Sequence, residues 1–476
     1  MSIGQALSSA NSGLAAVSRQ ASVVSQNIAN ALTPGYSRRD VSLSEVVIGG
    51  VGGGVRVAGI ARAETAALTA DRRAAASLAS GLSLRAGALG AIADFLGGPE
   101  DANALFARVS SFHDSLRVLA NAPDNLAAQS AAVDASRSLA TSLNQAGAML
   151  DRRRAEADSA ITTQVDAVNA ALKSIELLNE RVVRANAAGQ DASALLDERD
   201  RQIEIVNTAI PVRLLTREGG RVDLMTGEGA LLLSGTARRI DFSASPVITP
   251  DMTFAGGALS GLSVDGVALN PGGGELAAQF AIRDEIAPQA QADLDAFASE
   301  LISRFAAPGL DPTLAPGAAG LFTDAGFALS PPAAPGLAQR LEINAAVDPA
   351  QGGAAWRLRD GLGSIVEGAP GANGFILAMV AAIDTAGPSP FGGQGANLLE
   401  AAAELANLAG ARRAAIANDA QAQSVYAQGL KEAELSQTGV DTDQEMQSLL
   451  LIEQAYAANA KVIAAIGEMI DRLMEI

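Results

Sequence analysis

The acidic residues best spaced for catalysis are Asp197, Glu198 and Asp200, which lie close together in one predicted helical segment. Neighbouring carboxylates can act as general acid and base when their environments separate their pKa values. Arg199 and Arg201 alternate with these acids, and charges of opposite sign at such spacing commonly form ion pairs along a solvated helix face. We therefore expect the acidic run to be structural rather than catalytic.

The remaining candidates for chemistry lack the partners that their chemistry requires. The chain has no cysteine and a single histidine, His113, so thiol catalysis, disulfides and zinc–thiolate sites are excluded. Residues 49–54 are rich in glycine, but they precede a predicted strand and lack the Lys-Ser/Thr ending of a phosphate loop. Asp441 and Asp443 do not fit the spacing of a calcium loop, and we expect Asp443 to cap the following helix. The sequence predicts no enzyme, no cofactor and no metal site.

Composition narrows the remaining classes of protein. A chain of 476 residues is long enough for about three domains. The net charge of −18 disfavours nucleic-acid binding, which requires clustered positive charge. We find no apolar run long enough for a membrane span and no secretory signal at the N-terminus. Abundant alanine with only 3% aromatic residues favours close-packed helices over a large sheet.

Both ends of the chain carry an apolar repeat with steps of three and four residues. The N-terminal seam comprises Ile3, Leu7, Ala10, Leu14, Val17, Ala21, Val24 and Ile28. The C-terminal seam comprises Leu449, Ile452, Tyr456, Asn459, Ile463, Ile466, Ile470 and Leu473. Apolar residues spaced every 3.5 positions form a narrow stripe that another helix must cover. The two termini are therefore expected to pair with each other or with neighbouring copies.

Two residues within these repeats are unfavourable for helix pairing. Asn459 is polar at a seam position, which costs stability but can fix the register of the helices. Alternatively, Asn459 merely tolerates a hydrated position. Gly13 costs roughly 1 kcal/mol relative to alanine within a helix.

The pattern between the termini predicts a mainly helical protein with an inserted β-containing outer domain. Helices are expected over residues 3–31, most of 64–210 including one at 125–188, 275–305 with a kink at Pro288, 375–383 and 397–436. Strands are expected over residues 41–48, 55–60, 212–215, 222–225, 230–233, 341–344 and 355–358. The expected domains are a terminal coiled coil (1–36 with 440–476), a long helical bundle with a β-hairpin (37–210 with 372–439) and a distal β-containing domain (211–371).

The most distinctive local sequence follows the first helix. It contains Asn27, Asn30, Pro34, Gly35 and Tyr36 and ends in Arg38 and Arg39. By local physics it is an ordinary helix stop, in which Asn30 and Gly35 suit turn geometry and the two arginines could face acids on a neighbour. The string resembles the N-terminal signature of the bacterial flagellar rod, hook and hook-associated proteins. The match extends through residues 54–62. At the other end of the chain, residues 438–446 and 454–463 are similar to the C-terminal signature of the same group.

Within this group, residues 195–200 and the long helical region resemble the hook-associated protein 1 family rather than hook protein. The resemblance implies a structural protein of the hook–filament junction, exported by the flagellar type III pathway without a cleaved signal peptide and located outside the cell. It implies partners: a homo-oligomeric ring, hook protein, the second junction protein (hook-associated protein 3) and an export chaperone. The candidate chaperone-binding residues are Met446, Leu450, Ile463 and Ile470. The alternatives are hook protein itself, a cytoplasmic coiled-coil scaffold, or a peptidoglycan-cleaving axial protein, for which no catalytic cluster is evident.

Overall fold

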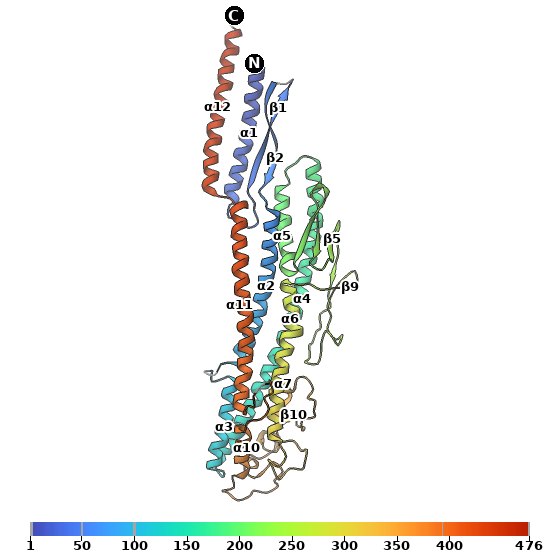
Figure 1. The fold of residues 1–476 in the computed structure, drawn as a ribbon, viewed down its shortest axis with the longest axis vertical. Coiled ribbons are helices and arrows are strands. Elements are labelled where there is room, and N and C mark those ends of the chain that lie inside the picture. The colour runs from blue at the N-terminus through green and yellow to red at the C-terminus, as the bar shows by residue number, and fades with distance from the viewer. Residues whose placement is uncertain (1–2, 49–50, 99–100, 393, 475–476) are drawn as a thin grey trace.

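The computed structural model describes residues 3–48, 51–98, 101–392 and 394–474. The chain forms an elongated rod, with the N- and C-terminal helices side by side at one end and a loop-rich region at the other (Figure 1). The fold class predicted from the sequence, mainly helical with small antiparallel sheets and paired terminal helices, is confirmed. Most strands of the expected outer domain, however, lie beside the middle of the rod rather than at its far end (Figure 1).

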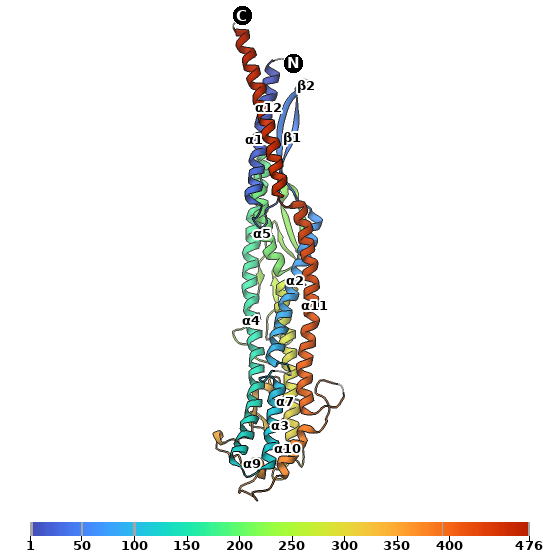
Figure 2. The same cartoon turned by 90° about the vertical axis from the view of Figure 1, so that its left-hand side faces the viewer.

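Helices account for the length of the rod. They are α1 (Ile3–Asn30), α2 (Ala66–Leu96), α3 (Leu105–Asn121), α4 (Leu126–Ala187), α5 (Ser193–Ala209), α6 (Gly274–Ala281), α7 (Ala287–Phe305), α8 (Leu337–Arg340), α9 (Arg357–Asp360), α10 (Gly374–Asp384), α11 (Leu398–Thr438) and α12 (Thr442–Met474). Helix α4 has 62 residues and is about 90 Å long at 1.5 Å per residue, so it extends along much of the rod. It runs parallel to α2 and α11, which pack against each other along the rod (Figure 2).

Two local predictions need correction. Residues 355–358 are not a strand, because the Trp356 carbonyl accepts the backbone N–H groups of Arg359 and Asp360 and closes a helical turn. The interruption expected at Pro288 lies just before it, in one π-helical turn at Ile282–Ile286. Pro288 itself occupies the first turn of α7, where its missing N–H would have no helical partner.

The strands form four small antiparallel sheets. They are β1 (Arg39–Ile48), β2 (Val51–Arg62), β3 (Val212–Thr216), β4 (Val222–Thr226), β5 (Leu231–Ser234), β6 (Thr236–Ala237), β7 (Ile240–Asp241), β8 (Leu262–Val264), β9 (Val267–Leu269), β10 (Phe322–Asp324) and β11 (Leu341–Ile343). The strands pair in the orders β1-β2, β3-β4-β5-β6, β7-β8-β9 and β10-β11.

The β1-β2 hairpin is longer than the sequence predicted. Of the glycines expected to join its strands, Gly52, Gly53 and Gly54 lie within β2, whereas Gly49 and Gly50 lie outside the described residues. Gly54 has φ +113°, and a Cβ there would lie 2.2 Å from the Ser12 hydroxyl of α1. The glycine thus allows the hairpin to approach α1 closely, and the Ser12 hydroxyl accepts the Val55 N–H at 3.1 Å.

Two hydrophobic cores follow one another along α4. Residues 132–150 of α4 contribute to the first core with α3, α7, α10, α11 and the end of α2. Residues 161–175 contribute to the second core with α5, α6 and the sheets β3–β9. This second core explains the position of those sheets, because it fixes them to the middle of the rod. Helices α6 and α7, within the expected outer domain, lie along the rod against α4.

A buried polar layer separates the two cores. The guanidinium of Arg283, in the π-helical turn, lies 2.6 Å from Asp158 and 2.8 Å from Asp284. Arg154 of α4 donates to the backbone carbonyls of Arg283 and Thr249, both at 2.9 Å. Burial lowers the pKa of Arg154, and the carbonyl acceptors satisfy its charge-bearing N–H groups.

Two helical stretches are long and apolar enough, by length and composition alone, to meet the criterion for a membrane span: Ala66–Leu96 and a window within Leu398–Met474. The expectation that no apolar run is long enough for a membrane span is therefore wrong by this criterion. Alanine raises the mean hydropathy of both stretches, and helices of a packed rod pass the same test.

Candidate assembly site at the junction of the terminal helices and the rod

The terminal helices α1 and α12 pack side by side and run in opposite directions (Figures 1 and 2). Among the seam residues of α1, Val17 and Val24 are buried, Leu14 and Ile28 are partly buried, and Ile3 and Leu7 are exposed. Among those of α12, Ile466 is buried, Leu449, Ile452, Asn459 and Ile463 are partly buried, and Tyr456, Ile470 and Leu473 are exposed. At this point of α12 the partly buried residue is Ala455, whereas the neighbouring Tyr456, expected in the seam, is exposed. The two seams are therefore covered from the rod outward, and they are exposed at the ends that carry the chain termini.

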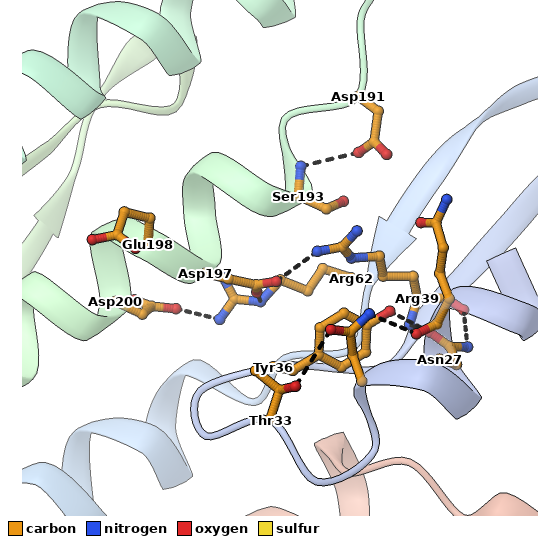
Figure 3. Close-up of polar contacts among 12 residues, drawn as sticks. Asn27, Thr33, Tyr36, Arg39, Arg62, Asp191, Ser193, Asp197, Glu198 and Asp200 are labelled. Atoms are coloured by element: carbon orange, nitrogen blue, oxygen red, sulfur yellow. Dashed lines mark hydrogen bonds and ion pairs between the residues drawn. The ribbon is translucent and has the colours of Figure 1, made fainter.

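Asn27 joins the end of α1 to the start of β1. Its amide N–H donates to the Arg39 carbonyl at 2.9 Å, and its amide oxygen accepts the Arg39 N–H at 3.1 Å. The same oxygen accepts the Tyr36 hydroxyl at 2.8 Å. Asn27 is almost fully buried, so these bonds fix the path of the chain after α1 (Figure 3).

The other motif residues shape the turn itself. The Asn30 side chain donates to the Gln26 carbonyl at 2.9 Å and accepts the Thr33 hydroxyl at 3.3 Å. The exposed Pro34 precedes Gly35, which has φ +77°. A Cβ at Gly35 would lie 3.1 Å from the Arg201 side chain of α5, so glycine serves both the backbone conformation and the close approach.

A chain of ion pairs extends from this turn across the top of the rod. We call its members the junction cluster: Arg39 (β1), Arg62 (β2), Arg72 and Arg73 (α2), Asp197, Asp200 and Glu204 (α5) and Glu434 (α11). Asp197 lies 2.7 Å from Arg39 and 3.4 Å from Arg62, which also pairs with Asp200. Figure 3 shows Asp197 and Asp200 on α5 facing the guanidiniums from the hairpin.

The second half of the cluster connects α5 to α2 and α11. Arg73 lies 3.0 Å from Asp200 and 2.7 Å from Glu204. Arg72 pairs with Glu204 and lies 2.5 Å from Glu434 of α11. The junction cluster thus connects the hairpin, α2, α5 and α11 at the point where the rod meets the terminal helices.

The environment of each carboxylate sets its protonation. Burial would raise the pKa of Asp200, but Arg62 and Arg73 outweigh it and lower that pKa. Burial opposes the lowering at Glu204 in the same way, and Arg72 and Arg73 again keep its pKa below the usual range. At Asp197 burial prevails and raises the pKa despite Arg39 and Arg62. Because Asp197, Asp200 and Glu204 are each paired with two guanidiniums, the arrangement suits a positioning role rather than proton transfer.

The sequence singled out two parts of this site, but it did not indicate that they contact each other. The motif after α1 and the acidic run at residues 197–200 each stood out, but Arg62, Arg72, Arg73 and Glu434 did not. Arg39 faces an acid of its own chain, not of a neighbour as considered above. The adjacent arginines at 72 and 73, in a helix rich in alanine and leucine, were the signal that could have indicated acidic partners.

Backbone contacts complete the junction. The Arg38 N–H donates to the Thr438 carbonyl at the end of α11 at 2.8 Å. The cap of α12 is Asp441 rather than the expected Asp443, since the Asp441 carboxylate accepts the N–H groups of Asp443 and Gln444 at 2.9 and 3.2 Å. Two segments that are 400 residues apart in sequence therefore enter and leave the terminal pair at one place.

The remaining candidate residues lie away from the junction. His113 is buried in α3 with its Nε2 3.1 Å from a carboxylate oxygen of Asp384. Within the part of the chain that the structure describes, no group of three His, Cys, Asp or Glu residues is arranged to hold a metal ion. Of the candidate chaperone-binding residues, Met446, Leu450 and Ile470 are exposed and Ile463 is partly buried.

Comparison with known families supports the resemblance on two separate parts of the chain. Residues 89–308 match the model of the flagellar hook-associated protein FlgK helical domain. Residues 432–476 match the model of the C-terminal region of flagellar basal body rod FlgEFG proteins. The first match covers α3, α4, α5 and α7, and the second covers α12.

Individual relatives agree with these models. Flagellar hook-associated protein 1 of Escherichia coli (strain K12) is 27% identical over 277 residues, 56% of this chain and 50% of that protein. The protein of the same name from Salmonella typhimurium is 28% identical over 274 residues, 55% of this chain and 49% of that protein. That of Bacillus subtilis (strain 168) is 25% identical over 237 residues, 47% of this chain and 46% of that protein. The chain thus matches about half the length of these relatives.

A solved structure is similar to a comparable portion. The flagellar hook junction protein FlgK from Burkholderia pseudomallei has a TM-score of 0.44 and 23% identity, over 53% of this chain and 46% of that one. The likeness to known proteins therefore stands on the family models and the curated relatives. Over about half of its length, the chain is similar to flagellar hook-associated protein 1, the FlgK protein.

Proposed function

We propose that this protein is a structural component of the bacterial flagellum that forms the hook–filament junction. The observation that carries the proposal is the pairing of α1 with α12 at one end of a rod whose helices match the FlgK helical domain. The relatives that match half of the chain are named hook-associated protein 1. The carboxylates of the junction cluster are ion-paired to arginines, which supports a mechanical role without catalysis or cofactor.

The free surface of α12 supports assembly into a ring of identical subunits. Leu451, Val462 and Met469 are exposed on α12, as are Ala458 and Ala465 between them. From Leu451 onward, the five residues follow one another at steps of seven, four, three and four. This second apolar stripe, in addition to the seam that faces α1, suits contact with a helix of a neighbouring copy. In the ring, the terminal pairs would form the inner tube and the rods would project outward.

The proposed partners follow from this position in the flagellum. One end of the ring would dock on hook protein, and the other would support hook-associated protein 3 and then the stiffer filament. The chain would reach this site through the flagellar type III pathway. Before export, a chaperone would cover α12 at Met446, Leu450, Ile463 and Ile470, of which only Ile463 would have to leave α1.

Gold-labelled antibodies on sheared flagella test the proposal. We expect label at the boundary between hook and filament and none along either of them. Label along the whole hook would instead identify hook protein, the alternative that shares the C-terminal region. Recovery of the protein only from the cytoplasm would refute the proposal and favour a coiled-coil scaffold.

A further inference from the structure

Gly13 in the middle of α1 faces the side chain of Asn459 on α12. A Cβ built at Gly13 would lie 2.8 Å from the Asn459 amide oxygen and 3.2 Å from both its carbon and its nitrogen. Non-bonded carbon contacts are favourable near 3.5–4.0 Å. A Cβ at residue 13 and the Asn459 amide would therefore have to move apart by about half an ångström or more. Glycine at this position therefore makes the room that the amide occupies.

The Asn459 side chain is held in the orientation that needs this room. Its Nδ2 donates to the Ala455 carbonyl one turn earlier at 3.0 Å. The amide oxygen is the atom of Asn459 closest to the position of the absent Cβ. Turning the amide away would break the bond to Ala455 in a partly buried place, where a lost hydrogen bond costs stability.

We propose that Gly13 and Asn459 are a size-matched pair that determines the register of α1 on α12. A slip of one heptad in either direction would place Ala6 or Gln20 opposite the amide, and both have a Cβ. The other glycine of α1, Gly4, lies nine positions from Gly13 and so cannot take its place after a heptad slip. The apolar seam residues alone would tolerate such a slip, since their repeat is the same after seven residues.

This inference concerns pairing within one chain and does not depend on the flagellar role. It reverses the ordinary expectation for glycine in a helix. By helix propensity alone, Gly13→Ala would stabilise α1 by up to about 1 kcal/mol. With Asn459 opposite, the same substitution should weaken the pairing of α1 with α12.

Hydrogen exchange of the full chain, read at the amides of α12, tests the pair. We expect Gly13→Ala to speed exchange about tenfold, as is typical of coupled neighbours. In an Asn459→Ala background, Gly13→Ala should instead slow exchange. Gly4→Ala and Gly467→Ala are matched controls, because a Cβ at either has no atom within 4 Å. Both should slow exchange or leave it unchanged.

The sign of the two effects decides the outcome. If Gly13→Ala slows exchange in both backgrounds, as the controls do, the residue is an ordinary helix glycine and the proposal fails. If Gly13→Ala speeds exchange equally in both backgrounds, the contact is not with Asn459 and the proposal also fails. Amides of α4 serve as the internal reference for a folded rod, because α4 lies outside the terminal pair.

Discussion

At the scale of single residues, the junction depends on side chains that bond to elements far away in sequence. The Asn27 side chain accepts one hydrogen bond from the backbone of β1 and donates another to it. Asp197 of α5 forms ion pairs with guanidiniums from both strands of the hairpin. Asp197 is buried, so the loss of its charge would leave Arg39 without a counter-ion and Arg62 with Asp200 alone. The cost of such a loss exceeds that of any surface ion pair.

Replacing Asp197 with asparagine tests this point. We expect Asp197→Asn to lower the free energy of unfolding by about 3 kcal/mol, because it breaks a buried ion pair by removing one partner. Urea-induced unfolding measures the loss. Glu198→Gln is the matched control in the same helix, since Glu198 pairs with Arg201 at the exposed surface and should cost no more than about 0.5 kcal/mol. Equal losses in the two variants would contradict the importance of the junction cluster.

The pH dependence of stability should reveal Asp200. Its pKa is lower in the folded chain than in the unfolded one, because Arg62 and Arg73 outweigh its burial. The carboxylate therefore contributes stability above the unfolded pKa of about 4, and that contribution disappears as pH falls through the folded pKa. The difference in unfolding free energy between the natural chain and Asp200→Asn should be largest near pH 7 and shrink below about pH 4. A difference that stays constant down to pH 3 would contradict this explanation.

At the scale of helices and strands, the sequence predicted where an element begins and ends better than it predicted which other elements that element packs against. The extent of α4 follows from local signals, since the Asn125 side chain caps it and Gly189, with φ +65°, follows its end. The pairing of α2 with α11 could not be predicted, because α11 is rich in alanine all round and has no distinct apolar face. The ion pairs of the junction cluster could not be predicted for a related reason. Arg39 and Asp197 are 158 residues apart in sequence, and only the fold brings them together.

The start of α11 offers a test at this scale. Asn397 and Glu400 form a capping box, in which each side chain bonds the other's backbone N–H at 2.9 and 2.8 Å. Asn397→Ala should lower the free energy of unfolding by about 1 kcal/mol. Asn418→Ala, the same change at an exposed interior position of α11, should be neutral or slightly stabilising because alanine is the better helix former. Urea unfolding of the two variants distinguishes them, and equal effects would argue against a capping role.

At the scale of the whole molecule, the terminal pair forms a separate unit at one end of the rod. Helix α12 packs on α1, whereas α4 contributes to both cores of the rod, with α2, α7 and α11 in the first and α5 and α6 in the second. Only one short connection, after Thr438, leads from α11 into α12. The rod should therefore be stable without the C-terminal helix.

Removing residues 440–476 tests this independence. The truncated chain should keep the melting temperature of the rod, since neither hydrophobic core includes a residue of α12. It should lose the helical signal of α12 and part of that of α1, because α1 packs on the β1-β2 hairpin as well as on α12. Circular dichroism during heating measures both effects. A large fall in the melting temperature of the rod would contradict the division into two units.

Deleting the gene and examining the cell surface by electron microscopy, with an assay of the medium for flagellin, tests the proposed function most directly. A junction protein lies between hook and filament, so its absence should leave intact hooks without filaments and flagellin lost to the medium. Cells without hooks would transfer the role to hook protein. Motile cells with normal filaments would contradict a flagellar role altogether.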